Sequence, residues 1–222
     1  GNYTWARALR GETYRQMGKF DEALADLDRA VALDDQNAEY FDLRAQVLEK
    51  LDDLEGAGKA YEKAIELDPD RAYSYNNLGG LLLKLGELEK AAHQFRERIR
   101  LSPADGLNAY VHLGLIKLAQ SKLEEAEEQF NAALSVWATA LAKELQTKAA
   151  LWELKALTLA CLGRVEEGKA ALAEMAQAWS ASDEWDVEKW EFVLRLDAVP
   201  EGFREVWEQL QEIGKDIKGR QP

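Results

Sequence analysis

A repeat of 34 residues constrains this chain more than any other feature of its sequence. Leu33, Leu67 and Leu101 are spaced at this interval. Three further sets have the same spacing: Ala23, Ala57 and Ala91; Leu27, Tyr61 and Phe95; and Gly18, Asp52 and Gly86. A unit of this length buries little apolar surface by itself, so such units must stack on their neighbours. The period therefore predicts an array of similar units.

Each unit has the pattern of two amphipathic helices joined by a short turn. In the third unit, the spacing of apolar residues predicts a first helix over residues 73–85 and a second over 88–101. Gly86 separates them, and Pro103, which cannot continue a helix, follows the second. The chain has only four prolines and is rich in strong helix formers. These features predict an all-α fold.

The helix–turn–helix unit and its period resemble those of the tetratricopeptide repeat family. The third unit matches the family pattern at Tyr75, Leu78, Gly79, Ala91, Phe95 and Pro103. The resemblance implies a single right-handed α-solenoid over residues 1–222. Five helix pairs are expected at about 4–37, 38–71, 72–105, 107–146 and 149–180, and two extra C-terminal helices at about 183–197 and 201–218. The opening residues also look like arrays in bacterial multidomain signalling proteins.

Composition argues against several classes of function. The formal net charge is −13, with 41 acidic and 28 basic side chains. Binding to nucleic acid or to an anionic membrane surface requires the opposite excess. No run of about 18 apolar residues exists, so no membrane-spanning helix is expected. Cys161 is the only cysteine, so no internal disulfide can form, and we expect a reducing, cytoplasmic compartment.

No motif in the sequence indicates a catalytic, metal or cofactor site. Gly79 and its neighbours precede Lys84, as glycines do in a phosphate-binding loop, but Lys84 is followed by Leu85 rather than by Ser or Thr. We expect Gly79 instead to lie where the two helices of its unit cross. His93 and His112 are too few and too isolated to build a zinc site with one cysteine. The chain is therefore predicted not to be an enzyme.

The resemblance implies that the first helices line a concave groove. Transferred position by position, it gives a set of candidate partner-binding residues: Glu12, Arg15, Asp42, Gln46, Glu49, Tyr73, Asn76, Asn77, Gly80, Leu83, Lys84, Asn108, Val111, His112, Leu115 and Leu118. This set changes from polar and acidic at its N-terminal end to apolar at its C-terminal end. A peptide or helix with an apolar stripe and a basic end fits this gradient. The alternative is that the apolar members belong to the core.

The predicted function is therefore non-catalytic protein–protein interaction, as a scaffold, adaptor or sensor. Members of the family are best known for gripping the acidic C-terminal tails of heat-shock chaperones. That clamp needs basic side chains at groove positions where this chain has none, and carboxylates such as Glu12, Asp42 and Glu49 would repel an acidic tail. We expect no chaperone clamp here.

The C-terminal part departs from the regular period. Units four and five start 42 residues apart, and Phe130, Leu134 and Trp137 form a stripe that runs into the extra segment. The second helix of unit four is therefore predicted to be about two turns longer than the others.

The last predicted helix has an apolar face that includes Phe203, Trp207, Leu210 and Ile213. Three destinations are open for this face: a cap on the last repeat, the concave groove, or a contact with another chain. The third makes homo-oligomerisation, through this helix or the long helix of unit four, the alternative function.

Overall fold

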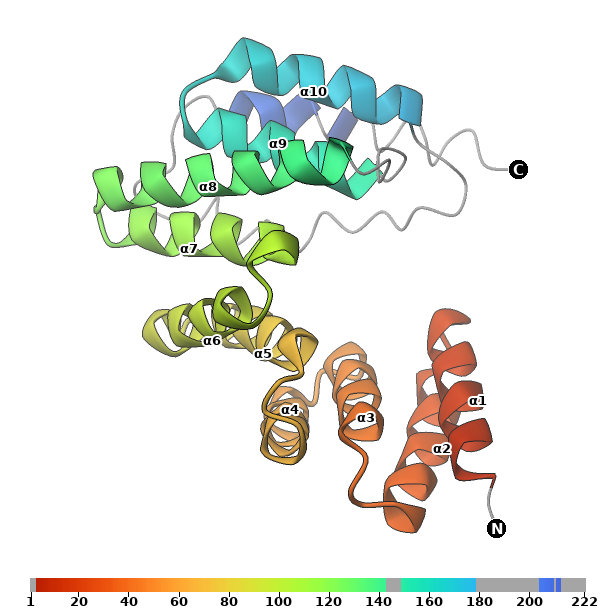
Figure 1. The fold of residues 1–222 in the computed structure, drawn as a ribbon. Coiled ribbons are helices and arrows are strands. Elements are labelled where there is room, and N and C mark those ends of the chain that lie inside the picture. Colours follow the sequence, from red (N-terminus) through yellow and green to blue (C-terminus); the bar gives the residue numbers. More distant parts are fainter. Residues whose placement is uncertain (1–2, 143–148, 179–203, 210, 213–222) are drawn as a thin grey trace. The chain divides into compact units, whose positions relative to one another are not determined.

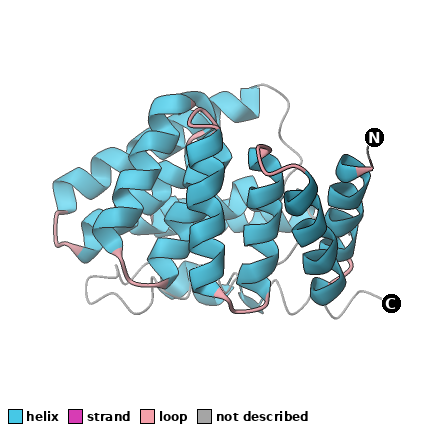
Figure 2. Cartoon of the chain, turned by 90° about the horizontal axis from the view of Figure 1, so that it is seen from below, coloured by secondary structure: helices cyan, strands magenta, loops and turns pink. Residues whose placement is uncertain are grey.

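The computed structural model describes residues 3–142, 149–178, 204–209 and 211–212. Helices and connecting turns account for these ranges, as Figure 1 and Figure 2 show, and no strand occurs within them. None of the described helices combines the length and apolar character needed to cross a bilayer. The prediction of an all-α fold of tetratricopeptide-like helices is confirmed.

Ten α-helices form five sequential antiparallel pairs in the described part of the chain, one pair for each predicted repeat. The pairs are α1 (Thr4–Gln16) with α2 (Phe20–Leu33), α3 (Ala38–Lys50) with α4 (Leu54–Leu67), α5 (Ala72–Lys84) with α6 (Leu88–Leu101), α7 (Leu107–Ala119) with α8 (Leu123–Ala142), and α9 (Ala149–Cys161) with α10 (Val165–Ala178). A short 3-10 helix, η1 (Pro103–Asp105), begins at the proline that was expected to end the third pair.

The pairs are distributed over two compact units, Gly1–Leu101 and Ser102–Pro222. The N-terminal unit holds the first three pairs. The C-terminal unit holds the last two pairs and the helical residues near the C-terminus. The single array expected over residues 1–222 stays a prediction.

The same backbone turn ends the first helix of each pair. The residue two places after the helix has a positive φ in all five: 72° at Gly18, 64° at Asp52, 75° at Gly86, 59° at Ser121 and 72° at Gly163. At Gly86, the N–H donates to the carbonyl of Leu83 (3.0 Å), and the N–H of Glu87 donates to the carbonyl of Leu82 (2.9 Å). This pair of bonds is the Schellman arrangement, which satisfies carbonyls at the helix end and reverses the chain.

A small residue on the first helix lies against a large one on the second. A Cβ added at Gly79 would lie 2.8 Å from Phe95 Cε1, and a Cβ added at Gly114 would lie 2.4 Å from Phe130 Cε1. Both distances are shorter than real contacts of a Cβ, and both phenylalanines are fully buried. The expected role of Gly79 at the helix crossing is therefore confirmed.

Gly80, the next residue, has a different environment. A Cβ added there would meet no atom within 4 Å. A glycine in the interior of a helix is less favourable than alanine by about 1 kcal/mol. Packing among the described residues does not account for this glycine.

The extension of the fourth pair is confirmed within the described residues. Helix α8 has 20 residues, whereas α4 and α6 have 14 each, a difference of slightly less than two turns. Phe130 and Trp137 are buried, and Leu134 packs against the same apolar cluster. The predicted stripe therefore faces the core.

Helical residues 204–209 and 211–212 pack on the last pair. Lys169 of α10 forms an ion pair with Glu205, with 3.0 Å between Nζ and Oε2. A Cβ added at Gly168 of α10 would lie 3.2 Å from Val206 Cγ2, and Val206 and Trp207 are buried. This position fits the cap hypothesis. The predicted helix at 183–197 and the side chains of Phe203, Leu210 and Ile213 lie outside the described residues.

The two adjacent glycines of α5 are expected to respond in opposite ways to the same substitution. Gly79→Ala forces a methyl group into the Phe95 ring and should lower the free energy of unfolding by about 1–2 kcal/mol, because overpacking outweighs the gain in helix propensity. Gly80→Ala should raise it by up to about 1 kcal/mol. Urea denaturation followed by circular dichroism measures both. Stabilisation by both variants would show that the helix crossing tolerates a Cβ.

Candidate functional site

The predicted groove residues of the N-terminal unit lie on α1, α3 and α5, the first helices of its three pairs. The side chains that the structure leaves exposed or half-buried form what we call the first-helix surface. Its members are Trp5, Glu12, Arg15, Gln46, Glu49, Tyr73, Asn76, Asn77, Gly80 and Lys84.

Helix α5 contributes a continuous row to this surface. Tyr73, Asn76, Asn77, Gly80 and Lys84 follow one another at helical spacing, so they share one face of the helix. Tyr73 is 70% exposed, and the guanidinium carbon of Arg98 lies 5.7 Å from the centre of its ring. The open space at Gly80 lies in the middle of this row. The row therefore has an exposed aromatic side chain at one end, a lysine at the other, and bare backbone between them.

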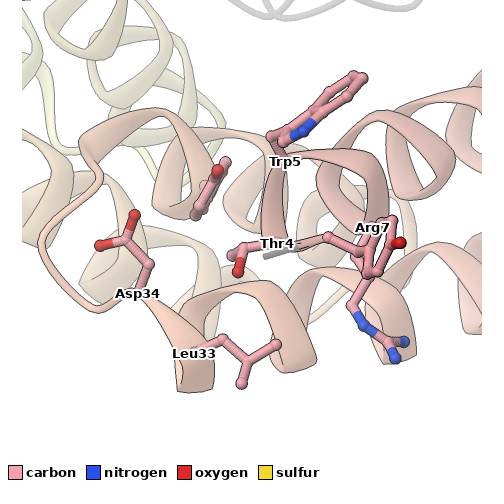
Figure 3. A pocket seen from close by; sticks show the side chains of 7 residues that line it. Thr4, Trp5, Arg7, Leu33 and Asp34 are labelled. Atoms are coloured by element: carbon pink, nitrogen blue, oxygen red, sulfur yellow. The ribbon is translucent and has the colours of Figure 1, made fainter. Parts of the chain in front are cut away.

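A second exposed aromatic side chain lies on the first pair. Trp5 of α1 is 63% exposed and occupies the same position in its repeat as Tyr73 does in the third. It borders a notch of about 540 Å³, lined by Tyr3, Thr4, Trp5, Arg7, Leu33, Asp34 and Tyr40. Figure 3 shows that the indole points away from Leu33 and Asp34. Exposed aromatic groups therefore occur on both the first and the third pair.

The carboxylates of the first-helix surface are paired within the chain. Arg15 holds Glu12 through two bonds of 2.7 Å, and this hydrogen bonding lowers the pKa of Glu12. Glu49 accepts from the Tyr61 hydroxyl at 2.7 Å and from Lys84 Nζ at 2.8 Å. These contacts largely neutralise the acidic character predicted for this end of the groove. The partner of Glu12 is three residues along the same helix, whereas the partners of Glu49 come from other helices and are not apparent from helical spacing.

Asp42 was predicted to line the groove but is buried, with 2% of its surface exposed. Its Oδ2 accepts hydrogen bonds from Arg71 Nε and from Ser74 Oγ, the latter at 2.8 Å. Its Oδ1 is buried without a hydrogen-bond partner among the described residues. Burial raises the pKa of Asp42, although Arg71 and Ser74 act in the opposite direction. Asp42 therefore connects α3 to the start of α5 instead of facing a partner.

Asp26 is a second buried carboxylate, and its pKa is lowered, whereas that of Asp42 is raised. Both of its oxygens accept from Arg10, at 2.5 Å and 2.7 Å. The hydrogen bonds from Arg10 lower the pKa of Asp26, and they join α1 to α2 within the first pair.

The apolar end of the predicted groove is buried in the structure. Val111, Leu115 and Leu118 of α7 belong to an apolar cluster that also contains Phe130 and Trp137 of α8, Leu157 of α9, Val206 and Trp207. Leu83 of α5 is also buried. The reading of these four side chains as an open apolar groove is wrong for this structure, because neighbouring elements cover them. Asn108 is exposed and His112 half-buried on the same helix α7.

The described residues offer no cluster of three His, Cys, Asp or Glu side chains that could hold a metal ion. Burial raises the pKa of the Cys161 thiol, which keeps it protonated near neutral pH and makes it a poor nucleophile. Trp207, one of the predicted self-contact residues, is buried within its own chain.

The two buried carboxylates should titrate on opposite sides of the ordinary aspartate pKa of about 3.9. In the folded chain, Asp42 takes up a proton at a higher pH than the same residue does in the unfolded chain. Its charged form therefore opposes folding at neutral pH, and this penalty disappears as the pH falls through its folded pKa. Ionised Asp26 stabilises the fold, and that contribution is lost as the pH falls through its lowered pKa.

Nuclear magnetic resonance of the side-chain carboxyl carbons measures the pKa values of Asp42 and Asp26 directly. An Asp42 pKa below that of an ordinary aspartate would mean that the Arg71 contact outweighs the lost hydration.

Comparisons with known proteins agree with the arrangement of the helix pairs. A family model described as TPR repeat matches residues 11–52 and 50–86, and a second, described as Tetratricopeptide repeat, matches residues 76–135. Together these matches cover more than half of the 222 residues. A search of curated proteins finds no match.

Several solved structures share the fold. TTC0263, a thermophilic TPR protein of Thermus thermophilus, matches with a TM-score of 0.64 and 18% identity, covering 87% of this chain and 98% of that chain. PilF of Pseudomonas aeruginosa matches with a TM-score of 0.63 and 21% identity, covering 97% of this chain and 90% of that chain. The first TPR of Spaghetti (RPAP3), bound to the HSP90 peptide SRMEEVD, matches with a TM-score of 0.51 and 23% identity, covering 53% of this chain and 93% of that chain. At these identities the likeness concerns the fold alone. With the family models, it establishes that this chain belongs to the tetratricopeptide repeat family.

Proposed function

We propose that this chain is a non-catalytic interaction module that binds a segment of a partner protein across the first-helix surface. Tetratricopeptide repeats are typically protein–protein interaction modules, and no enzyme family matches this chain. The observation that carries the proposal is the open space at Gly80, between exposed Tyr73 and Lys84. The module would serve as a scaffold, adaptor or sensor.

Gly80 supports close approach of a partner backbone. A helix gains stability when an interior glycine is replaced by alanine, unless the added methyl group collides with something. Nothing within the described residues lies near the position of that methyl group. A partner segment that crosses α5 at this point would supply the missing neighbour, since backbones approach most closely where a side chain is absent.

The exposed aromatic groups support an apolar contribution to binding. Tyrosine and tryptophan are enriched in protein interfaces, where they bury a large area with few rotatable bonds. Tyr73 and Trp5 are among the most exposed large apolar side chains in the described residues. We expect an apolar side chain of the partner to pack on Tyr73.

The paired charges bear on the chemistry of the partner. Glu12 is held by Arg15, and Glu49 by Lys84 and Tyr61. A strongly charged segment would find few uncompensated charges opposite it, so an amphipathic segment with polar side chains fits better. The amides of Asn76, Asn77 and Gln46 can donate to and accept from such a segment.

The RPAP3 repeat domain is a fold relative whose bound ligand is an acidic HSP90 peptide. This chain lacks the basic side chains of a carboxylate clamp, with Ala8, Tyr73 and Asn77 in their place. We therefore propose a different class of ligand for the same fold.

Affinity capture with matched variants tests this proposal. Gly80→Arg places a long side chain across the first-helix surface, and Ala25→Arg introduces the same side chain at an exposed position of α2. A partner should be captured by the unaltered chain and by Ala25→Arg, but lost with Gly80→Arg. Tyr73→Ala should weaken the capture. Equal capture by all baits would contradict binding at this surface.

A further inference from the structure

A second groove lies between α4 and α6, the second helices of the second and third pairs. We call it the second-helix groove. Its volume is about 540 Å³, and ligand pockets typically enclose roughly 300–1,000 Å³. Its floor consists of Leu78, Leu81 and Leu82 of α5, which are buried, and of Leu85, which directly follows that helix. These leucines lie about a third of a turn around α5 from the row that begins at Tyr73. The groove and the first-helix surface therefore use different faces of one helix.

The floor of the second-helix groove leaves apolar surface open to solvent. Leu85 is 46% exposed, and Leu54, at the start of α4, is half-buried. Polar and charged side chains of α4 and α6 form the rim. An apolar strip bordered by a polar rim is the usual composition of a protein contact surface.

Gly58 opens the wall of the groove on the α4 side. A Cβ added at Gly58 would lie 3.6 Å from Leu81 Cδ2, which is an ordinary van der Waals distance. The fold would accommodate alanine here, and alanine is the better helix former. Leu81 itself is buried, so the consequence of glycine is that the α4 wall of the groove has no side chain at this point. Like Gly80, it is an interior helix glycine that internal packing does not require.

The rim of the groove has an excess of negative charge. It holds four carboxylates and two lysines: Glu55, Glu62, Glu87, Glu89, Lys59 and Lys90. Lys59 is paired with Glu55, and Lys90 with Glu87. The hydrogen bond to Glu87 raises the pKa of Lys90, and Glu62 on the opposite wall adds to this effect. Each wall of the groove therefore carries two carboxylates and one lysine.

We propose that the second-helix groove is a separate docking site, which binds a partner helix with a leucine-rich face and lysine or arginine residues beside it. The apolar floor would bury the leucines, in the manner of an amphipathic helix in a groove. The rim carboxylates would attract the basic side chains and favour this partner over an acidic one. This site goes beyond the binding proposed for the first-helix surface and does not depend on it.

Titration of the isotope-labelled full chain with two synthetic peptides tests the site. One is a helical peptide with leucines four residues apart and lysines at its flanks, and the other has glutamate in place of every lysine. The lysine peptide should shift the amide signals of Gly58, Leu81 and Leu85. It should bind about tenfold more tightly or better than the glutamate peptide, with a difference that shrinks at high salt.

Three glycine variants locate the binding. Gly58→Trp fills the groove and should weaken binding of the lysine peptide by about tenfold or more, whereas Gly58→Ala should bind nearly as well as the unaltered chain. Gly80→Arg, which blocks the first-helix surface, should leave this binding unchanged. Circular dichroism confirms that each variant is folded.

Several results would overturn the proposal. These are no signal shifts at about millimolar peptide, equal affinity for both peptides, or loss of binding with Gly80→Arg instead of Gly58→Trp. Signal shifts at the groove that appear on concentrating the chain without peptide would identify a second copy as the occupant, and would also overturn it. Failure here does not count against binding at the first-helix surface, because that proposal is tested by capture of a partner with Gly80→Arg, Ala25→Arg and Tyr73→Ala, and not by these peptides or the Gly58 variants.

Discussion

The close contact between a glycine on the first helix and a large residue on the second is the constraint on which the first, third and fourth helix pairs depend. Where Gly79 meets Phe95, or Gly114 meets Phe130, the ring occupies the space that a Cβ would need. This contact sets how near the two helices lie, and the Schellman turn sets how the second returns along the first. The contact and the turn together determine which face of each first helix is left for solvent or for a partner.

Polar contacts then fix how neighbouring pairs meet within the N-terminal unit. Asp42 bridges α3 to the start of α5 through Arg71 and Ser74, and Glu49 bridges α3 to α5 through Lys84. Because these carboxylates are used internally, the surface that the first helices present is less acidic than the composition suggests. The same contacts restrain the side chains of Glu49 and Lys84, which would reduce the entropy lost if the proposed partner binds there.

Two interior glycines with no packing role connect the fold to the proposed functions. Gly80 leaves bare backbone on one face of the third pair, and Gly58 leaves the α4 wall beside Leu81 without a side chain. Each glycine makes its helix less stable than alanine would, at a place where the absent side chain would let a partner chain approach closely. If both surfaces bind, α5 would connect two partner segments through a single helix, which is a physical basis for a scaffold.

The sequence by itself determined the period, the five helix pairs, the turn positions and the role of Gly79, because these depend on local spacing and on residue size. It also identified the exposed row from Tyr73 to Lys84. Only the tertiary structure decided that Asp42, Val111 and Leu115 are buried and that Glu49 is paired with Lys84 and Tyr61. Helical periodicity shows which residues share a face, but not what covers that face. Whether a side chain is open depends on elements far along the chain, such as Arg71 for Asp42.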